Sequence, residues 1–414
     1  MKDLYRDAKI IIDKTIQTVH PGKETRSALK NRQFKGDIYL LAIGKAAYTM
    51  AKAASEELGD KIKRGIIITK YGHSLGEIEG MEIIEAGHPL PDDNSVKGAE
   101  KAIEMIQDMN EIDELIFLIS GGGSALFEKP LPGITLNDII GINSQLLSCG
   151  ADITEINMIR KRLSCVKAGR FAELCAPAKI FTIIMSDVLG DKIDAIASGP
   201  AAPDLSTSEQ AMNVIRKYQI NVNNTVKKYI ETETPKQLDN IETKIIANVN
   251  TLCESAAKIA VELGYNPYIV CTEMNCEARE AGRFISAIAK QINSAKIFNP
   301  PCAVIFGGET VVTIKGAGKG GRNQEIALSA ARGIDGIDKL IIFSLGSDGT
   351  DGPTDAAGGI VDGNTCRRLL EKGMTAENFL ADNDSYNGLS EADALIKTGP
   401  TGVNINDITV ILCN

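Results

Sequence analysis

Short apolar segments alternate with longer amphipathic ones along the first half of the chain. The apolar segments run without polar interruption, so both faces of each are expected to be covered, as in a parallel sheet between helices. The pattern predicts strands at residues 37–43, 65–69, 114–119 and 179–185 and helices at residues 45–58, 95–109 and 135–148. Thr135 is expected to be the N-cap of the last helix. This alternation is typical of a doubly wound, Rossmann-like parallel sheet.

A second α/β region follows a polar segment that Pro235 interrupts. A chain of 414 residues is long enough for two domains, and we place their boundary near residues 235–243, with residues 1–238 in the first and 239–414 in the second. The pattern after the boundary predicts helices at residues 251–263 and 277–292 and strands at residues 244–247, 267–271, 302–306, 310–315 and 340–345. The strands at 302–306 and 310–315 are expected to form a pair that turns at Gly307-Gly308.

Composition and charge narrow the classes of function. The formal net charge of −9 and the pI of about 5.2 argue against a nucleic-acid-binding surface, although a local cluster of Lys and Arg can still bind an anionic substrate. The nine cysteines include no C-x-x-C pair, as expected of reduced thiols in a cytosolic protein. Neither a signal peptide nor a run of the roughly 20 apolar residues that a membrane span needs is present. We therefore expect a cytoplasmic protein with no membrane partner.

Polar and glycine-rich residues stand where the predicted strands end, which is where ligands bind in open α/β sheets. Lys45 opens a helix directly after Gly44, and a lysine is unusual there unless an anion is near; a solvent-facing lysine is the alternative. The run Ser120-Gly121-Gly122-Gly123-Ser124 follows a buried strand. Three glycines expose backbone N–H groups that can bind phosphate oxygens, with a flexible turn as the alternative.

Two strand ends carry pairs of carboxylates. Asp187 and Asp191 follow one strand, and Asp348 and Asp351 follow another. Carboxylate oxygens suit Mg²⁺, which binds few protein ligands and keeps its waters. Aspartates that only shape turns are the alternative. His88, in a loop with two prolines, is expected to be structural, with a catalytic base as the minor alternative.

A G-x-G-x-x-G motif occurs as Gly316-Ala317-Gly318-Lys319-Gly320-Gly321, after a β-branched run and before a helical pattern. That is the outline of a dinucleotide-binding turn, but the acidic residue expected about 20 positions later is not at a strand end. Lys319 and Arg322 place two cations in the turn, which suits a phosphoryl group that is being transferred. A P-loop match is absent, since neither Lys45 nor Lys319 is followed by Ser or Thr.

Several of these motifs together resemble a known family. Residues 307–310 (GGET), 316–325 (GAGKGGRNQE) and 348–358 (DGTDGPTDAAG) resemble the MOFRL domain of the class II glycerate kinases, the glycerate 2-kinases. The first half is similar to that family's first domain at residues 42–46 (AIGKA), 87–92 (GHPLPD), 120–125 (SGGGSA), 157–170 and 186–200, and the tail at 398–407 matches as well. One departure is Lys167-Ala168-Gly169-Arg170, where the family usually has two glycines that allow a close backbone approach.

The resemblance implies two three-layer α/β/α domains, the second with a mixed MOFRL-type sheet, and an active site in the cleft between them. It implies ATP-dependent phosphorylation of D-glycerate, to 2-phosphoglycerate, with Mg²⁺ or another divalent cation. It also implies active-site roles for Lys45 and Arg322. Lys45 and Arg322 belong to different predicted domains, so the two domains must close for both cations to act on one ligand. The segment at 235–243 is therefore a candidate hinge.

Roles can then be assigned to the candidate residues. We expect Lys45, Arg322 and Asp187 to be catalytic, and Lys45, Ser120 and Arg322 to bind substrate. The nucleotide phosphates are assigned to Gly121, Gly122, Gly123, Ser124, Gly316, Gly318, Lys319, Gly320 and Gly321. Asp187 and Asp348 are the candidate metal ligands or general bases. Two alternatives remain: a hydroxypyruvate reductase that uses NAD(P)H, and a non-catalytic sugar-acid sensor. The 2- or 3-position of the product and formation of a homo-oligomer stay open.

Overall fold

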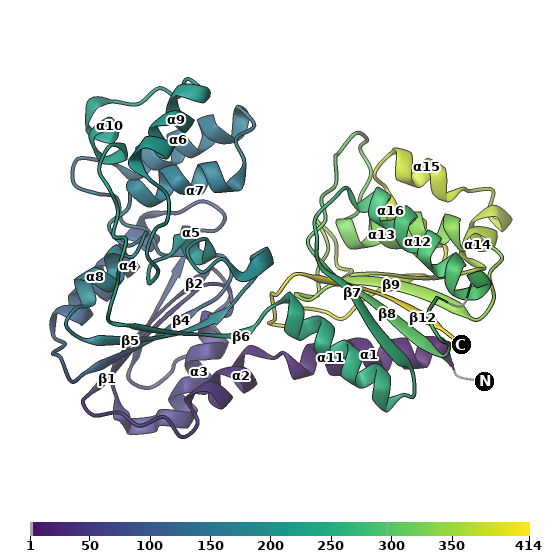
Figure 1. Ribbon diagram of the computed structural model, residues 1–414, viewed down its shortest axis with the longest axis horizontal. Coiled ribbons are helices and arrows are strands. Elements are labelled where there is room, and N and C mark those ends of the chain that lie inside the picture. The colour runs from purple at the N-terminus through teal and green to yellow at the C-terminus, as the bar shows by residue number, and fades with distance from the viewer. Residues whose placement is uncertain (1–2, 296) are drawn as a thin grey trace. The chain divides into compact units, whose positions relative to one another are not determined.

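The computed structural model describes residues 3–295 and 297–414, which divide into two compact units. The first, called the parallel-sheet unit, is Pro21–Ile246. The second, called the mixed-sheet unit, combines residues 3–20 with residues 247–414. The prediction of two three-layer α/β units, the first with a parallel and the second with a mixed sheet, is confirmed (Figure 1).

The sheet of the parallel-sheet unit has the strand order β3-β2-β1-β4-β5-β6, and its first five strands pair in parallel. The strands are β1 (Ile38–Ile43), β2 (Ile62–Lys70), β3 (Met81–Ala86), β4 (Glu114–Ile119), β5 (Lys179–Met185) and β6 (Ile241–Ala247). The chain runs outward from β1 to β3 and then returns to begin β4 on the other side of β1. The carboxyl ends of β1 and β4 therefore form the topological switch point at which doubly wound sheets bind ligands.

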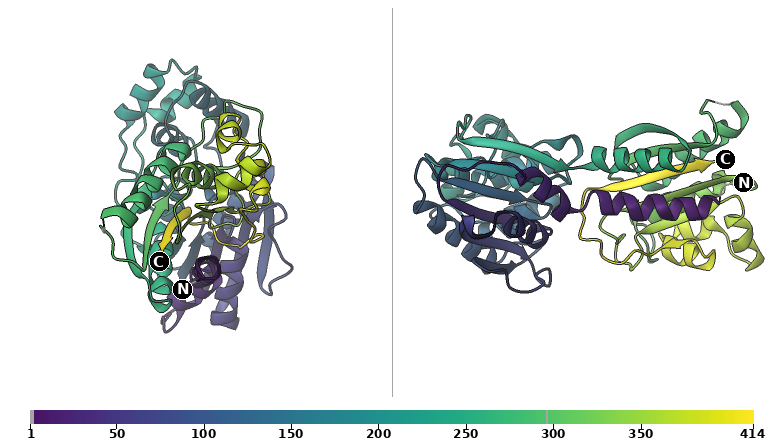
Figure 2. Two further views of the ribbon diagram at one scale, coloured as in Figure 1. Left: turned by 90° about the vertical axis from the view of Figure 1, so that its right-hand side faces the viewer. Right: turned by 90° about the horizontal axis from the view of Figure 1, so that it is seen from below.

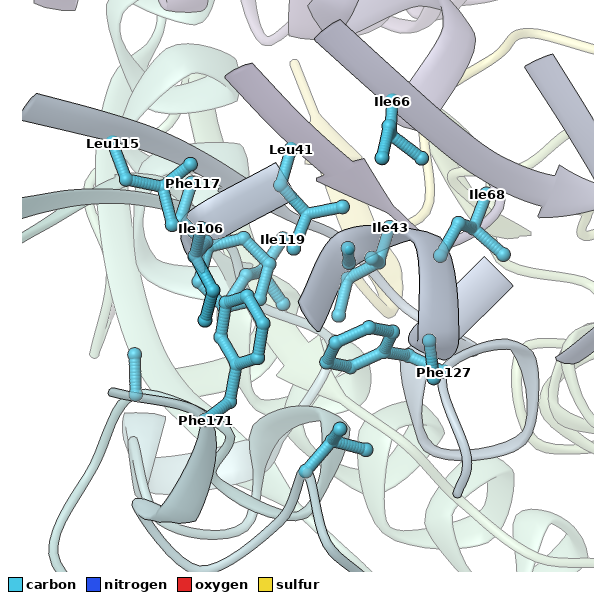
Figure 3. Close-up of a cluster of buried hydrophobic side chains, with 14 of the residues drawn as sticks. Leu41, Ile43, Ile66, Ile68, Ile106, Leu115, Phe117, Ile119, Phe127 and Phe171 are labelled. Carbon is cyan, nitrogen blue, oxygen red and sulfur yellow. The ribbon is translucent and has the colours of Figure 1, made fainter. Parts of the chain in front are cut away.

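Helices cover both faces of this sheet because its strands are apolar on both sides. The helices are α2 (Pro21–Leu29), α3 (Ala47–Leu58), α4 (Asp93–Gln107), α5 (Gly123–Leu126) and α8 (Arg170–Cys175). Helix α3 packs on β1 and β2 from one face, and α4 packs on β2 and β3 from the other. The rings of Phe117, Phe127 and Phe171 meet in the core on the second face, with centroids 5.2–6.2 Å apart (Figure 3).

A further helical layer lies beyond α5 and has an apolar core of its own (Figure 1). It contains α6 (Leu136–Ser148), α7 (Ile153–Arg162), α9 (Ser208–Lys217) and α10 (Asn224–Ile230). Short 3-10 turns occur at η1 (Gly59–Lys61), η2 (Leu189–Asp191) and η3 (Ile196–Ser198).

Thr135 caps α6 as predicted, since its side chain accepts the amide of Asp138 and the Asp138 carboxylate accepts the amide of Thr135.

The sheet of the mixed-sheet unit has the order β11-β10-β9-β12-β8-β7, in which only β7 and β8 pair in parallel. The strands are β7 (Asn266–Met274), β8 (Cys302–Gly308), β9 (Leu340–Gly346), β10 (Gly358–Asp362), β11 (Leu395–Ile396) and β12 (Asp407–Cys413). Helices α1 (Leu4–Thr18) and α11 (Val249–Glu262) cover one face, as Figure 2 also shows for α1 beneath β12. The other face carries α12 (Ala278–Ala295), α13 (Arg322–Gly333), α14 (Thr365–Glu371), α15 (Ala376–Ala381) and α16 (Ser385–Glu391).

Two differences from the predicted organisation involve the domain boundary. Helix α1 belongs to the mixed-sheet unit, because its apolar stripe packs on α11 and on β9 and β12. This helix begins at Leu4, and Met1 and Lys2 lie outside the described residues. The strand expected at residues 244–247 is the end of β6, which completes the sheet of the parallel-sheet unit. Contacts thus divide the chain at 20/21 and 246/247, where the sequence placed a single boundary at 238/239.

The predicted strand at residues 310–315 is wrong. Only Val311 of this run makes a β-bridge, to Glu277, and the β-branched residues are largely solvent-facing, with Ile314 78% exposed. The position beside β8 is taken by β12, which the sequence analysis did not predict. The fully buried strand β12 pairs with β8 on one side and β9 on the other, so it excludes a hairpin partner for β8.

Candidate active site

Two predicted binding loops meet at the switch point of the parallel-sheet unit. The Lys45 amide donates to the carbonyl of Gly121 (2.9 Å), and the Ala46 amide donates to Oγ of Ser120 (3.0 Å). Gly44 has a φ of +113°, and a Cβ at this position would overlap the backbone and side chain of Ser120. A glycine is therefore required for the loops after β1 and β4 to lie side by side.

The loop at residues 121–124 has backbone amides without hydrogen-bond partners in the described part of the chain. None of the four donates a hydrogen bond of ordinary geometry to any residue within 3–295 and 297–414. Gly121 and Gly123 are buried, and buried N–H groups in folded proteins are nearly always paired. A row of unpaired amides in a glycine-rich turn is a site that phosphate oxygens can satisfy.

Basic side chains surround this loop. A Cβ at Gly122 would lie 3.1 Å from Cδ2 of His88 and 3.3 Å from Cγ of Lys45, so both side chains border the loop. The carbonyl of Lys45 is held by Nδ1 of His73 (3.1 Å). Within the described part of the parallel-sheet unit, the ammonium groups of Lys45 and Lys70 form no ion pair. Uncompensated cations in a chain of net charge −9 favour an anionic ligand at this place.

His88 is neutral at physiological pH. Partial burial, together with the nearby charges of Lys45, Lys70 and His73, lowers its pKa to about 4. The imidazole can therefore accept or donate one hydrogen bond to a ligand without bringing a further charge. The position of His88 beside the loop thus gives a geometric basis to the minor alternative, in which His88 is a catalytic base. The sequence did not supply this basis.

We expect the His88 ring to titrate near pH 4 in the free protein and at a higher pH once a phosphate compound is bound, because an adjacent anion favours the imidazolium form. The chain has only three histidines, so ¹H–¹⁵N spectra of the imidazole rings resolve each of them. His88→Gln assigns the signal, and His20 is the internal control. An ordinary His88 pKa near 6.5 that ATP leaves unchanged would contradict this placement.

The departure at Lys167-Ala168-Gly169-Arg170 does not prevent a close backbone approach. Ala168 takes a φ of +55°, in the left-handed region that usually needs glycine. Its amide donates to the carbonyl of Ser198 (3.1 Å), and the amide of Gly169 donates to Gly199 (2.7 Å). An alanine thus replaces glycine here at the cost of backbone strain.

The second predicted loop, at residues 316–321, differs from the first because the amides of residues 316–319 are already paired. Amides of residues 315–319 donate to the segment Asp382-Asn383-Asp384, for example Ala317 to Oδ1 of Asp382 (3.0 Å) and Lys319 to Oδ1 of Asp384 (2.9 Å). A Cβ at Gly316 or Gly318 would overlap that segment. These amides therefore have partners within the chain, and the phosphate contacts expected of Gly316, Gly318 and Lys319 remain a prediction. Gly316 donates to Oδ1 of Asn383, and Gly318 donates to the backbone carbonyl of Asp382.

The backbone amides at the start of α13 are also paired within the chain. Asp351 accepts the amides of Asn323 (3.2 Å) and Gln324 (2.8 Å), and its side chain is 3% exposed. Burial raises the pKa of Asp351 to about 7, against the N–H donors, which lower it. Asp351 is thus an internal cap for α13, and the dinucleotide arrangement, in which bare amides face a pyrophosphate, does not occur here.

We expect Asp351→Ala to lower the free energy of unfolding by about 1–3 kcal/mol, because it leaves two buried amides without an acceptor. Urea unfolding at pH 8, above the raised pKa, measures the change. Asp355→Ala is the matched control: Asp355 is an exposed carboxylate four residues away whose surface ion pair with Lys397 contributes little. Equal stability of the two variants would contradict the capping role.

Arg322 is held at the carboxyl edge of the mixed sheet. Its Nε and Nη2 donate to the two carboxylate oxygens of Asp407 (2.6 and 3.2 Å), and its Nη1 donates to Glu309 (2.9 Å). Asp407 begins β12 opposite Gly308 and Gly346, so three strand ends meet here. Burial raises the pKa of Asp407 to about 6 although Arg322 lowers it, so the pair is ionised at pH 7.5.

The other predicted site residues are Lys319, Gly320, Gly321, Asp348 and Asp187. Lys319 places its ammonium 4.6 Å from the ring centre of Tyr386, and Gly320 and Gly321 pack against Ser385 and Asp351. Asp348 lies in the mixed-sheet unit and accepts the amide of Thr350 (2.9 Å). Asp187 lies in the parallel-sheet unit, directly after β5. Among the residues that the structure describes, no group of three or more His, Cys, Asp or Glu side chains is placed to hold a metal.

Sequence reasoning missed Asp407 and the segment 382–384. Asp407 could have been found from its place before the apolar run ITVILC, at the edge where Glu309 and Asp348 also fall. The segment 382–384 carries no such signal, since its role depends on contacts with residues about 65 positions away. The grouping of Lys45 and Lys70 around His88 follows only from the strand order.

The two α/β units and the loop at the switch point of the parallel sheet define a class of two-unit α/β proteins. Comparison with known proteins identifies the family. A domain of unknown function, DUF4147, matches residues 7–231, and the MOFRL family matches residues 302–407. The D-glycerate 2-kinase of Thermotoga maritima is 51% identical over 97% of this chain and 96% of the relative. The glycerate 2-kinase of Pyrococcus horikoshii is 44% identical over 92% and 89%. The crystal structure of a Thermotoga maritima glycerate kinase has a TM-score of 0.96 at 51% identity and covers 99% of both chains.

The chain therefore belongs to the class II glycerate kinase family with a C-terminal MOFRL domain. The resemblance found from the motifs is confirmed. No helix among the described residues is long and apolar enough to cross a membrane.

Proposed function

We propose that this protein transfers the γ-phosphoryl group of ATP to D-glycerate and forms 2-phospho-D-glycerate. The observation that carries the proposal is the open loop at residues 121–124, bordered by the unpaired ammonium of Lys45. Four unpaired amides and a nearby cation suit phosphate oxygens. The close relatives named glycerate 2-kinase supply the acceptor, D-glycerate.

The chemistry needs positioning and neutralisation of charge. The hydroxyl of glycerate attacks the γ-phosphorus, the bond from phosphorus to the leaving oxygen breaks, and ADP leaves. We assign the amides of residues 121–124 to the nucleotide phosphates and Lys45 to the glycerate carboxylate or the transferring phosphoryl group. Arg322 is assigned to charge on that group. Its bonds to Asp407 and Glu309 fix the direction of its guanidinium, and its side chain remains 34% exposed.

A divalent cation fits the donors that the chain offers. Mg²⁺ takes one or two carboxylates and completes its shell with phosphate oxygens and water, so a protein cage of three ligands is not needed. We assign Asp348, whose Oδ1 accepts one amide, or Asp187 as the carboxylate that would hold it, and either would serve as the general base. When bound, the ion would neutralise charge on the phosphates.

A reductase is less well supported. The G-x-G-x-x-G turn follows no strand, and its helix start is capped by Asp351, so the turn lacks the strand, open amides and acidic residue of a nicotinamide site. A non-catalytic sensor would bind the same ligands without turnover.

Product analysis separates the three possibilities. The protein is incubated with ATP, Mg²⁺ and D-glycerate, and ³¹P NMR follows the products. We expect ADP and 2-phosphoglycerate, formed only when D-glycerate is present. Oxidation of NADH by hydroxypyruvate without ADP would establish the reductase, and glycerate binding without either product would establish the sensor.

A further inference from the structure

A fully buried lysine lies beneath the loop at residues 121–124. The side chain of Lys167 is 0% exposed, and its ammonium donates to the carbonyls of Ser124 (2.9 Å) and Phe127 (2.7 Å). The carboxylate of Glu128, 1% exposed, lies 3.2 Å from the same nitrogen. Burial lowers the pKa of Lys167, and Glu128 opposes that shift. A lysine is rarely buried so completely unless every donor has a partner, and here three partners come from one five-residue segment.

That segment is the continuation of the glycine loop. Gly123 and Ser124 are the first residues of α5 (Gly123–Leu126), and Phe127 caps the end of that helix. The ring of Phe127 is fixed from the opposite side by Phe117 and Phe171 in the core (Figure 3). Lys167 thus holds the polar backbone of the segment while the aromatic cluster holds its apolar side chain.

The residues that follow Lys167 hold the other side of the loop. Amides of Ala168 and Gly169 bind the carbonyls of Ser198 and Gly199. Oγ of Ser198 lies 2.9 Å from Oγ of Ser124, and a Cβ at Gly123 would lie 2.8 Å from Cβ of Ala197. Ala197 and Ser198 have φ values of +50° and +62°, a strained conformation that persists only when its surroundings fix it. Residues 167–169 therefore act on residues 121–124 in two ways: Lys167 binds the carbonyl of Ser124, and Ala168 and Gly169 hold the segment 197–199 that packs on Gly123 and Ser124.

We propose that Lys167 is a positioning residue for the phosphate-binding loop. Its ammonium fixes the carbonyls of Ser124 and Phe127, and this keeps the amides of residues 121–124 turned toward the phosphates of ATP. The proposal rests on the proposed function in assigning ATP to this loop. It adds a requirement for a buried cation that contacts no substrate. A merely structural lysine would stabilise the fold and leave affinity for ATP unchanged.

The test compares Lys167→Met with the double variant K167M E128Q and the single variant Glu128→Gln. The double variant removes both buried charges, so it avoids the unpaired carboxylate that makes a single substitution of Lys167 strongly destabilising. We expect the double variant to bind ATP about tenfold more weakly in calorimetry, with KM for ATP raised to match and KM for D-glycerate changed by less than about twofold. Glu128→Gln keeps the ammonium on both carbonyls and should bind ATP within about threefold of the wild type.

Hydrogen–deuterium exchange of a peptide covering residues 119–127 localises the effect. ATP alone, without D-glycerate, should protect this peptide in the wild type and not in K167M E128Q. This readout needs no phosphoryl transfer, so absence of kinase activity in the wild type refutes the proposed function without deciding the role of Lys167. A folded double variant with wild-type affinity for ATP and wild-type protection would overturn the proposal, as would a wild-type peptide that ATP does not protect.

If the methionine variant does not fold, K167Q E128Q replaces it, because the NH2 group of glutamine keeps N–H donors for the carbonyls. The expected loss of ATP affinity is then about threefold or more, since only part of the contact survives. Unchanged affinity in that variant would also overturn the proposal.

Discussion

Replacing Lys45 by alanine is expected to lower kcat/KM for D-glycerate by about 10²–10³-fold, the scale of one lost preorganised donor at developing charge. The ammonium has no ion pair in its own unit, so its charge is available to a ligand. Its backbone is fixed independently of its side chain, by the bond of its amide to Gly121 and of its carbonyl to His73. Alanine should therefore remove the cation and leave the loop in place.

Lys52→Ala is the matched control for this substitution. Lys52 is an exposed lysine on α3, the helix that begins just after Lys45. We expect the control to keep wild-type kinetics and both variants to unfold at nearly the wild-type temperature, because neither side chain contributes much buried area. Wild-type kcat/KM in Lys45→Ala would return Lys45 to the role of a solvent-facing lysine.

Replacing Arg322 by lysine is expected to lower kcat by roughly tenfold or more, about 1.4 kcal/mol of transition-state stabilisation. The guanidinium binds Asp407 through two nitrogens and Glu309 through a third, so its planar fork sets the direction of its charge. Lysine keeps the charge but makes fewer of these bonds and directs its ammonium differently. ATP affinity, measured by calorimetry, should fall less than kcat, because the contact matters most as charge spreads in the transition state.

Arg332→Lys is the control variant. It shows whether replacing an arginine of α13 by lysine lowers kcat through lost packing alone. Arg332 lies near the other end of α13, is exposed to the same degree (33%) and pairs with Glu377. We expect wild-type kcat in this control. Arg322→Lys also weakens a partly buried ion pair, so kcat is taken per folded molecule at a temperature where circular dichroism shows no unfolding. An equal loss of ATP affinity and kcat would make Arg322 a binding residue only.

The glycine loops show why local sequence could locate sites without deciding what they bind. Both loops were predicted to hold phosphates, and both are rich in glycine for a physical reason, a close approach of backbone. In the loop at residues 121–124 the approach leaves amides open. In the loop at residues 316–319 it brings the carboxylates of Asp382 and Asp384 onto the amides. A glycine-rich loop indicates that another group approaches its backbone closely. Only the tertiary structure shows whether that group belongs to a ligand or to the same chain.

The sequence by itself determined the α/β class, most strands of the parallel sheet, the Thr135 cap, the family and the positions of Lys45 and Arg322. These features depend on local apolar runs, on short-range capping and on contiguous motifs. The tertiary structure alone decided that α1 joins the mixed-sheet unit, that β6 joins the parallel sheet and that β12, rather than residues 310–315, lies beside β8. It also decided that Lys167 binds the backbone of the loop at residues 121–124 and that Asp407 orients Arg322. These pairings join segments 43 and 85 residues apart, and the free energy of such contacts comes from burial and long-range hydrogen bonds that no local pattern encodes.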